Sequence, residues 1–251
     1  MADPAVPGAV ADRARPQLTI AQTDLLAQRM VEHCVRAGVL PTAPEGLWEG
    51  YHRLRPLLYD AFEIPDTHLT PLAARLLYAV ATIHRPQRVA VLGCYAGNLL
   101  GWVTAPGFGP TASYQGTHAV GLDVDADALV TAEGNLRRAG FGPAAVVVRA
   151  DAYAAADFAH LGPWDLVLVD IDEPGARKAG YARLVERWAP NLAPGALVLA
   201  HDVRHPVFQW DLRDYAARLL DLGAEASTSL PVDVCGIEIT RWGTAPTGAR
   251  P

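Results

Sequence analysis

The sequence predicts an α/β protein built on a doubly wound, mostly parallel sheet. Five short runs are apolar on both faces, as buried parallel strands are, and helix-length segments separate them. The chain has 251 residues, of which 51% are hydrophobic, and this is enough apolar mass for one large core. The predicted strands span residues 89–93, 119–123, 145–149, 165–170 and 196–200.

Helices are expected before the first strand. Residues 1–16 are rich in Ala, Pro and charge and lack periodicity, so we expect a disordered tail outside the fold. From Thr19 to Gly38 apolar residues recur at helical spacing, which predicts an amphipathic helix. Residues 17–85 are therefore expected to form a helical cap, and residues 86–251 the sheet domain.

Two further helices of this cap carry start signals. Thr42 and Glu45 have the spacing of a capping box, and the helix that they would begin contains Pro56, which should kink or split it. Thr70 followed by Pro71 is typical of an N-cap with proline in the first helical position.

The connections and the C-terminal part complete the predicted sheet. Residues 126–139 and 175–188 are predicted helices, and residues 110–116 an inserted loop before the second strand. The stretch 225–242 contains two β-rich pieces interrupted near Gly236, which predicts a hairpin.

Charge, cysteine content and hydropathy exclude several function classes. The formal charge of −6 argues against a nucleic-acid partner, because phosphates are bound mostly through Lys and Arg. Three distant cysteines form neither a disulfide framework nor paired zinc knuckles, which favours a reducing compartment. No apolar run approaches the ~18 residues of a membrane span, and the first residues lack the cationic and apolar stretches expected of a secretion signal. We expect a cytoplasmic protein without a nucleic-acid or membrane partner.

The end of the first strand carries a glycine turn. In open α/β sheets, ligands bind beyond the carboxyl ends of the strands. Gly93 and Gly97 are separated by three residues, which differs from the spacing of dinucleotide enzymes. Gly97 would let a ligand lie against the backbone at the next helix, although a turn that needs positive φ explains the pair equally well.

Acidic residues follow the next two strands. Asp123 could accept both hydroxyls of a ribose, and Asp151 with Ala152 suits an adenine amino group. Each Asp taken alone could be a helix N-cap. Together with the glycine turn, they favour a nucleoside site.

Five segments in this order resemble the S-adenosylmethionine (SAM)-dependent class I methyltransferases, most closely the small-molecule O-methyltransferases related to catechol O-methyltransferase. The likeness covers residues 86–242 and comprises residues 92–97, 123, 151–152, 164–172 and 230–239. It implies a Rossmann-like, seven-stranded sheet with an antiparallel C-terminal hairpin, and SAM over the glycine turn. The implied cofactor-binding residues are Gly93, Tyr95, Gly97, Asn98, Asp123, Val124, Asp151, Ala152 and Asp170.

One departure from the family pattern is the reason to consider a second activity besides methyl transfer. Val91 stands where relatives often have an acid that contacts the methionine end of SAM, so another acid such as Asp170 would have to meet the ammonium. Altered handling of this ammonium is what an intramolecular cyclase that releases methylthioadenosine would need. That activity is the alternative to methyl transfer.

The fourth and fifth strands end in groups suited to acid-base chemistry. Asp170 and Asp172 lie on one side of the pleat, and His201 with Asp202 ends the neighbouring strand. The resemblance implies a divalent metal on Asp170, His201 and Asp202, with Asp172 free as a base. Since magnesium prefers oxygen ligands and imidazole suits zinc or iron, a different metal or none is the other interpretation.

Lys178 is the one lysine in the chain. Related enzymes keep a lysine after this strand that helps to remove the acceptor's proton, so the catalytic candidates are Asp170, Asp172 and Lys178. A position on an exposed helix is the alternative, and we favour it slightly because Lys178 stands several residues beyond the family's position.

Aromatic residues are candidates for the substrate wall, although core packing is their commoner fate. These are Trp48, Tyr51 and Tyr59 of the cap and Trp210 after the fifth strand. The expected function is SAM-dependent O-methylation of a small, secondary-metabolite-like molecule. A homodimer is one of the oligomeric states compatible with the sequence.

Overall fold

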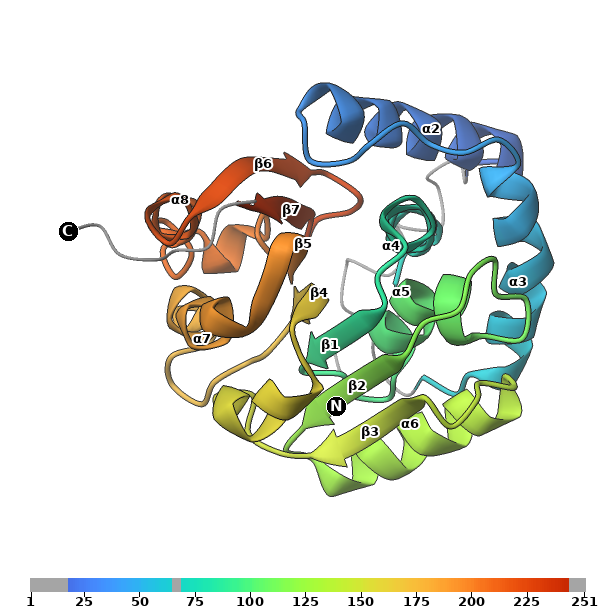
Figure 1. Cartoon of the computed structure of the whole chain (residues 1–251). Coiled ribbons are helices and arrows are strands. Elements are labelled where there is room, and N and C mark those ends of the chain that lie inside the picture. The colour runs from blue at the N-terminus through green and yellow to red at the C-terminus, as the bar shows by residue number, and fades with distance from the viewer. Residues whose placement is uncertain (1–17, 65–68, 244–251) are drawn as a thin grey trace, which may run out of the picture.

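The computed structural model, which describes residues 18–64 and 69–243, has one seven-stranded sheet between two layers of helices (Figure 1). The strand order is β3-β2-β1-β4-β5-β7-β6. Neighbouring strands pair in parallel except at β7, which is antiparallel to both β5 and β6. The strands are β1 (Arg88–Leu92), β2 (His118–Asp123), β3 (Ala145–Arg149), β4 (Trp164–Val169), β5 (Leu192–His201), β6 (Ala224–Leu230) and β7 (Ile237–Trp242). The predicted fold class is confirmed.

Strand periodicity divides the core into two halves. Val89 and Val91 of β1 pack on the side of α4, α5 and α6, whereas Ala90 and Leu92 pack on the side of α7 and α8. Both sets are fully buried, as the two-sided apolar runs predict. The helices are α2 (Ile20–Arg36), α3 (Leu47–Ala61), α4 (Pro71–His84), α5 (Asn98–Phe108), α6 (Ala126–Arg138), α7 (Tyr181–Trp188) and α8 (Tyr215–Asp221).

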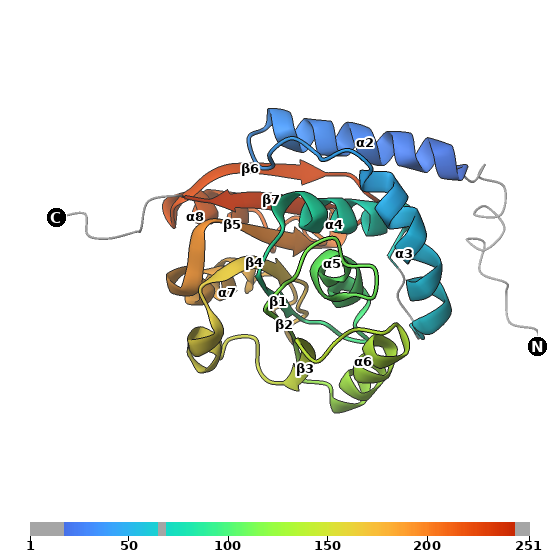
Figure 2. The same cartoon turned by 45° about the vertical axis from the view of Figure 1, so that its right-hand side comes forward.

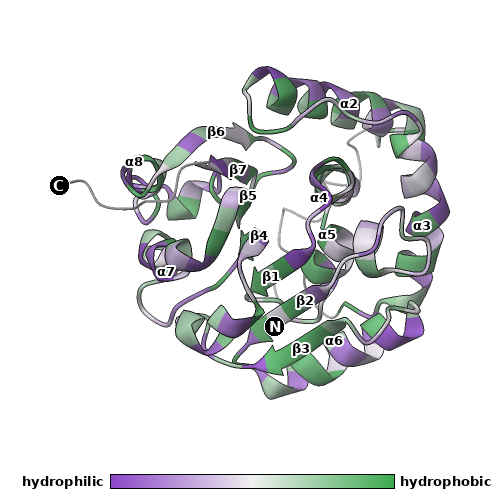
Figure 3. Ribbon diagram, viewed as in Figure 1, coloured by the Kyte–Doolittle hydropathy of each residue, from purple (hydrophilic) through white to green (hydrophobic). Residues whose placement is uncertain are grey.

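The N-terminal helices form an outer layer over one face of the sheet. Helix α4 is buried along most of its length and packs on α5, while α2 and α3 lie outside it (Figure 2). His33 of α2 also contacts β6, with 2.8 Å between its Nε2 and Thr228 Oγ1. Both polar and apolar residues run along α2, as expected of a helix with one face in the core (Figure 3). Residues 18–64 and 69–85 thus share one core with the sheet.

Several local predictions hold in atomic detail. The helix expected from Thr19 is present as α2, and Thr19 caps it in a capping box with Gln22 that was not predicted. Thr70 accepts a hydrogen bond from the Ala73 amide, with Pro71 in the first turn. The hairpin of β6 and β7 is present. The tail predicted for residues 1–16 lies outside the described residues.

Two local predictions are wrong, and one alternative of a third is excluded. Helix α3 begins at Leu47 with Gly46 as its N-cap, so Thr42 and Glu45 precede the helix and form no capping box. The helix continues through Pro56 without splitting. The helix predicted for residues 175–188 begins only at Tyr181, because residues 175–180 form a loop. Among the described residues, no helix has both the length and the hydropathy to cross a membrane.

Candidate active site

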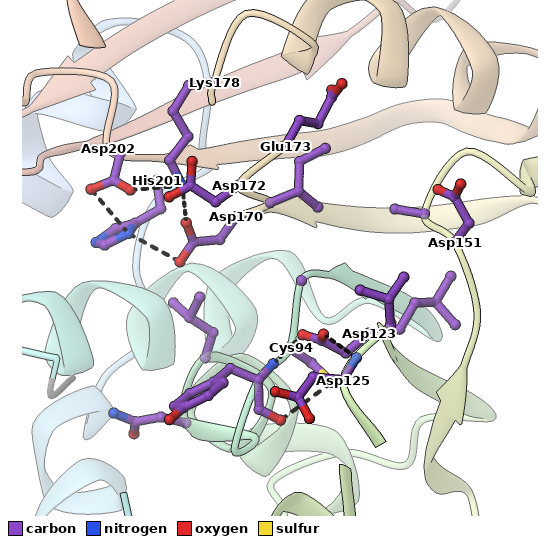
Figure 4. A pocket seen from close by; sticks show the side chains of 18 of the residues that line it. Cys94, Asp123, Asp125, Asp151, Asp170, Asp172, Glu173, Lys178, His201 and Asp202 are labelled. Atoms are coloured by element: carbon purple, nitrogen blue, oxygen red, sulfur yellow. Dashed lines mark hydrogen bonds and ion pairs between the residues drawn. The ribbon is translucent and has the colours of Figure 1, made fainter. Parts of the chain in front are cut away.

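A cavity of about 900 Å³ lies at the carboxyl edge of the parallel strands. Residues that follow β1, β2, β3, β4 and β5 line it, because parallel strands end at the same edge. Figure 4 shows two groups of side chains across this space: Cys94, Asp123 and Asp125 on one side, and Asp170, Lys178, His201 and Asp202 on the other.

The glycine turn brings the end of β1 against the end of β4. Gly93 has a φ of 82°, and a Cβ atom there would collide with the backbone carbonyl of Asp170. Tyr95 also has a positive φ, 44°. Gly97 is the N-cap of α5 and lies against Ala132 rather than in the cavity lining. The other residues predicted to bind the cofactor all line the cavity.

Asp123 organises this side of the cavity through backbone contacts. Its Oδ2 accepts a hydrogen bond from the Tyr95 amide at 2.8 Å, and its Oδ1 accepts one from the Asp125 amide at 3.0 Å. Asp125 in turn caps α6. The carboxylate is therefore held in place, and each of its oxygens keeps a further lone pair for a ligand.

The third strand contributes Asp151 and Ala152. Asp151 Oδ1 accepts the Tyr153 amide at 2.9 Å, and the carbonyl of Ala152 accepts the Trp188 indole N–H at 2.8 Å. Asp151 is exposed, whereas Ala152 is buried. This segment thus presents one carboxylate beside an apolar surface.

Lys178 lies at the opposite side of the cavity, between two carboxylates. Its Nζ is 2.9 Å from Asp170 Oδ1 and 2.9 Å from Asp202 Oδ2, and its side chain is only 3% exposed. The favoured alternative of an exposed helical lysine is wrong, since Lys178 belongs to the loop before α7. Asp202 adopts a left-handed φ of 65°, which costs an L residue roughly 1–2 kcal/mol and is tolerated best by Asn and Asp.

The ion pairs set the charges of this cluster. Burial alone would raise the pKa of Asp170, but His201 and Lys178 outweigh it and lower that pKa to about 2. Burial opposes the charge of Lys178, yet Asp170 and Asp202 raise its pKa above the usual value. The structure therefore holds Lys178 as an ammonium and Asp170 as a carboxylate.

His201 completes the cluster without a hydrogen bond of good geometry. Its Nδ1 lies 3.2 Å from Asp170 Oδ2 and 3.7 Å from Asp202 Oδ1, distances of ion pairs. Neither ring nitrogen has a hydrogen-bond partner among the described residues, although both are buried. Burial disfavours the imidazolium, but the surrounding carboxylates raise the His201 pKa overall. Because both oxygens of Asp170 face Lys178 and His201, its expected contact with a cofactor ammonium gains no support.

The metal ligands expected from the sequence do not all meet. Among the described residues, the group whose ligand atoms lie within 4.8 Å of one another is His201, Asp202 and Cys235, without Asp170. Lys178 separates Asp170 from Asp202, so an octahedral magnesium site on these two acids does not fit. Asp172 lines the cavity, and no hydrogen bond or ion pair to it occurs within the described ranges.

The predicted aromatic wall lies elsewhere. Tyr51 is fully buried between Arg75 and the stacked ring of Trp102, so it cannot contact a substrate. Trp48 donates to Gln28, and neither Tyr59 nor the largely exposed Trp210 lines the cavity. These side chains pack on α2 and α5 or face solvent because the outer helices cover the sheet face rather than the strand ends. Within the described part of residues 18–85, only Leu69 lines the cavity.

Sequence reasoning missed residues that the loops bring to the cavity. Cys235 and Asp233 come from the connection between β6 and β7, and Asp233 Oδ1 accepts the Cys235 amide at 2.8 Å. Burial and the Asp202 carboxylate raise the pKa of Cys235 to about 12. Tyr153 donates to Glu173 and so ties the loop after β4 to the segment after β3. No spacing signal links these residues, although their neighbourhood in the hairpin is part of the family resemblance.

Comparison with known proteins supports the architecture. No protein-family model matches the sequence, and no curated protein matches it. Solved O-methyltransferases share the fold: one from Bacillus cereus in complex with SAH has a TM-score of 0.59 at 16% identity, covering 85% of this chain and 97% of that one. Another, from Streptomyces achromogenes, is involved in tomaymycin synthesis and was solved with SAM; it has a TM-score of 0.56 at 18% identity, covering 80% and 91%.

A third similar structure is an SAH-bound methyltransferase from Podospora anserina. It has a TM-score of 0.57 at 18% identity and covers 91% of this chain and 99% of that one. The chain therefore has the fold of the SAM-dependent O-methyltransferases over nearly their whole length.

Proposed function

We propose that this protein is a SAM-dependent O-methyltransferase that acts on a small-molecule acceptor. One observation carries the proposal: the same cavity joins the glycine turn and Asp123 to the buried cluster of Asp170, Lys178 and Asp202. Groups suited to a nucleoside and a fixed cation suited to stabilising an acceptor oxygen thus open into one space. The fold shared with SAM- and SAH-bound O-methyltransferases supports the choice of cofactor.

The cofactor occupies the side of the cavity next to β1, β2 and β3. Gly93 lets SAM approach the backbone, and Asp123 accepts the ribose hydroxyls through its free lone pairs. Asp151 accepts the adenine amino group, since one of its oxygens is not used by the Tyr153 amide. The remaining contacts come from Tyr95, Asn98, Val124 and Ala152.

The acceptor lies on the side of Asp170, Asp172 and Lys178. Its hydroxyl gives its proton to Asp172, whose carboxylate faces the cavity. The oxygen then forms a bond to the methyl carbon while the bond from that carbon to sulfur breaks, and sulfur keeps the electron pair in the SAH that leaves. Lys178 retains its proton, so it stabilises the developing negative charge on the acceptor oxygen and is not the base.

The experiment is calorimetry with SAM and SAH, followed by incubation of the full chain with SAM and a panel of phenols and hydroxylated polyketides. We expect binding of both nucleosides and one methylated product for each SAH formed. Asp172→Asn should lower kcat, whereas the exposed Asp157→Asn should not. Absence of binding, or methylthioadenosine formed from SAM alone, would overturn the proposal, the latter in favour of a cyclase.

A further inference from the structure

We infer that His201, Asp202 and Cys235 form a site for a divalent transition-metal ion of the zinc type. One ligand atom of each residue lies within 4.8 Å of the other two, and all three residues line the cavity. The site differs from the oxygen-rich one that the family resemblance implies, because Cys235 replaces Asp170. It does not rest on the proposed function.

The donor atoms decide the class of metal. Imidazole nitrogen, carboxylate oxygen and thiolate sulfur together suit zinc or cobalt, whereas magnesium requires an octahedron of oxygens. Ligands bound to tetrahedral zinc at the usual bond lengths lie about 3.3–3.8 Å from each other. The three ligand atoms lie within a slightly wider 4.8 Å of one another, so small side-chain movements would bring them to these distances.

His201 supplies the second, independent observation. Its Nε2 is buried and has neither a hydrogen bond nor an ion pair within the described ranges, whereas Nδ1 faces Asp170. A buried polar group without a partner costs about 1–3 kcal/mol, so a ligand that satisfies it is favoured. Asp170 Oδ2, 3.2 Å from Nδ1, is placed as the outer carboxylate that commonly orients a metal-bound imidazole.

The charges around Cys235 also favour a cation. Asp170, Asp202 and Asp233 line this part of the cavity, and Lys178 is the lysine that faces them. The Cys235 amide donates to Asp233 Oδ1, which fixes the backbone of Cys235 beside the cavity. A dication bound here would convert the thiol to a thiolate and balance the excess negative charge.

Asp170 is not a ligand because it does not belong to the group whose ligand atoms lie within 4.8 Å of one another. The Lys178 ammonium takes Asp170 Oδ1 and Asp202 Oδ2, which leaves Asp202 Oδ1 directed toward His201. Three protein ligands leave the fourth position of a tetrahedral ion for water or for an acceptor oxygen.

Cobalt(II) is the probe, because tetrahedral cobalt absorbs visible light and cobalt bound to thiolate has an additional charge-transfer band in the near ultraviolet. We expect the full chain to bind one equivalent of cobalt with both signals, zinc to displace it, and excess magnesium to leave it in place. Cys235→Ser should abolish the charge-transfer band. His201→Ala should weaken cobalt binding more than the about 10–100-fold caused by loss of an outer partner.

Matched controls separate the site from other thiols and imidazoles. Cys34→Ala removes a cysteine of α2, and His205→Ala a histidine four positions beyond His201; both should keep the spectrum. Thermal unfolding confirms that each variant is folded. The inference is overturned if the unaltered chain gives no such spectrum, if Cys235→Ser keeps the charge-transfer band, or if only Asp170→Asn abolishes binding. None of these results depends on methyl transfer.

Discussion

Lys178 lies 2.9 Å from Asp170, measured between Nζ and Oδ1, although the loop after β4 separates the two residues. The same ammonium contacts Asp202 at the end of β5. A single side chain therefore ties two neighbouring strand ends to the loop that covers them. Lys178 is almost fully buried, so this ion pair forms part of the cavity wall on the acceptor side.

Lys178→Met should destabilise the protein and impair catalysis. It leaves Asp170 and Asp202 without their cation, and breaking such a buried pair costs about 3–5 kcal/mol, with the lower end expected beside an open cavity. Chemical denaturation measures the loss. Lys178→Arg keeps the charge and should recover much of the stability. An unchanged unfolding midpoint in Lys178→Met would show that the ion pairs contribute nothing.

Asp123→Ala should weaken SAM and SAH binding by about 1–3 kcal/mol, because two backbone amides and the ribose hydroxyls lose their acceptor. Calorimetry measures the change directly. Asp157→Ala removes an exposed carboxylate outside the cavity lining and should bind both ligands normally. Equal affinity in the two variants would refute the ribose contact.

Gly93→Ala should prevent stable folding or cofactor binding, because its Cβ would collide with the Asp170 backbone. Gly195→Ala is the matched control. Gly195 has a φ of 77° but no atom within 4 Å of an added Cβ, so this variant pays only the conformational cost of roughly 1–2 kcal/mol. Thermal unfolding should rank the two variants in that order, and similar midpoints would contradict the close approach.

Asp24→Ala should destabilise the packing of α2, α3 and α4. Its carboxylate accepts the Arg75 Nε–H at 2.6 Å and contacts His52 at 2.8 Å, and Arg75 is 1% exposed. A loss of about 3 kcal/mol is expected, since a buried guanidinium loses its counter-ion. Glu32→Ala on the exposed side of α2 should stay within about 0.5 kcal/mol. Urea titrations distinguish the two outcomes.

Glu238 should make stability depend on pH. Burial raises its pKa above the usual value, against hydrogen bonds from Ser227 and Thr240. A carboxyl whose pKa is raised by folding stabilises the fold most at low pH, and this contribution is lost as the pH rises through the raised pKa. Glu238→Gln should therefore be more stable than the unaltered protein at pH 7, and the advantage should vanish below the model-peptide value of about 4.3. A constant difference across this range would exclude titration of Glu238 as the cause.

Strand positions were predictable because their signal is local. Val89 and Ala90 are buried on opposite faces of the sheet, and each apolar segment of the sequence shows this alternation. The residue at which each apolar segment ends is also visible in the sequence. The positions of Asp123, Asp151 and Asp170 at the carboxyl edge of the sheet were predictable, because these residues stand at or just after the ends of those segments. The hairpin near Gly236 was predictable for the same reason.

Loop and cap side chains were not predictable in this way. The aromatic residues of α3 have helical spacing that fits a core or a lid equally well, and only the packing of α3 on α4 and α5 put Tyr51 in the core. Lys178 was expected on a helix because residues 175–188 are helical in composition.

The sequence by itself determined the sheet, its strand ends and the carboxylates that follow them, since hydrophobic periodicity acts over a few residues. Tertiary structure decided that Lys178 enters the space between Asp170 and Asp202, and that Cys235 lies beside His201. Those contacts join segments whose approach depends on how β4, β5 and β7 pair, and the pairing of distant strands leaves no trace in the spacing of any one segment.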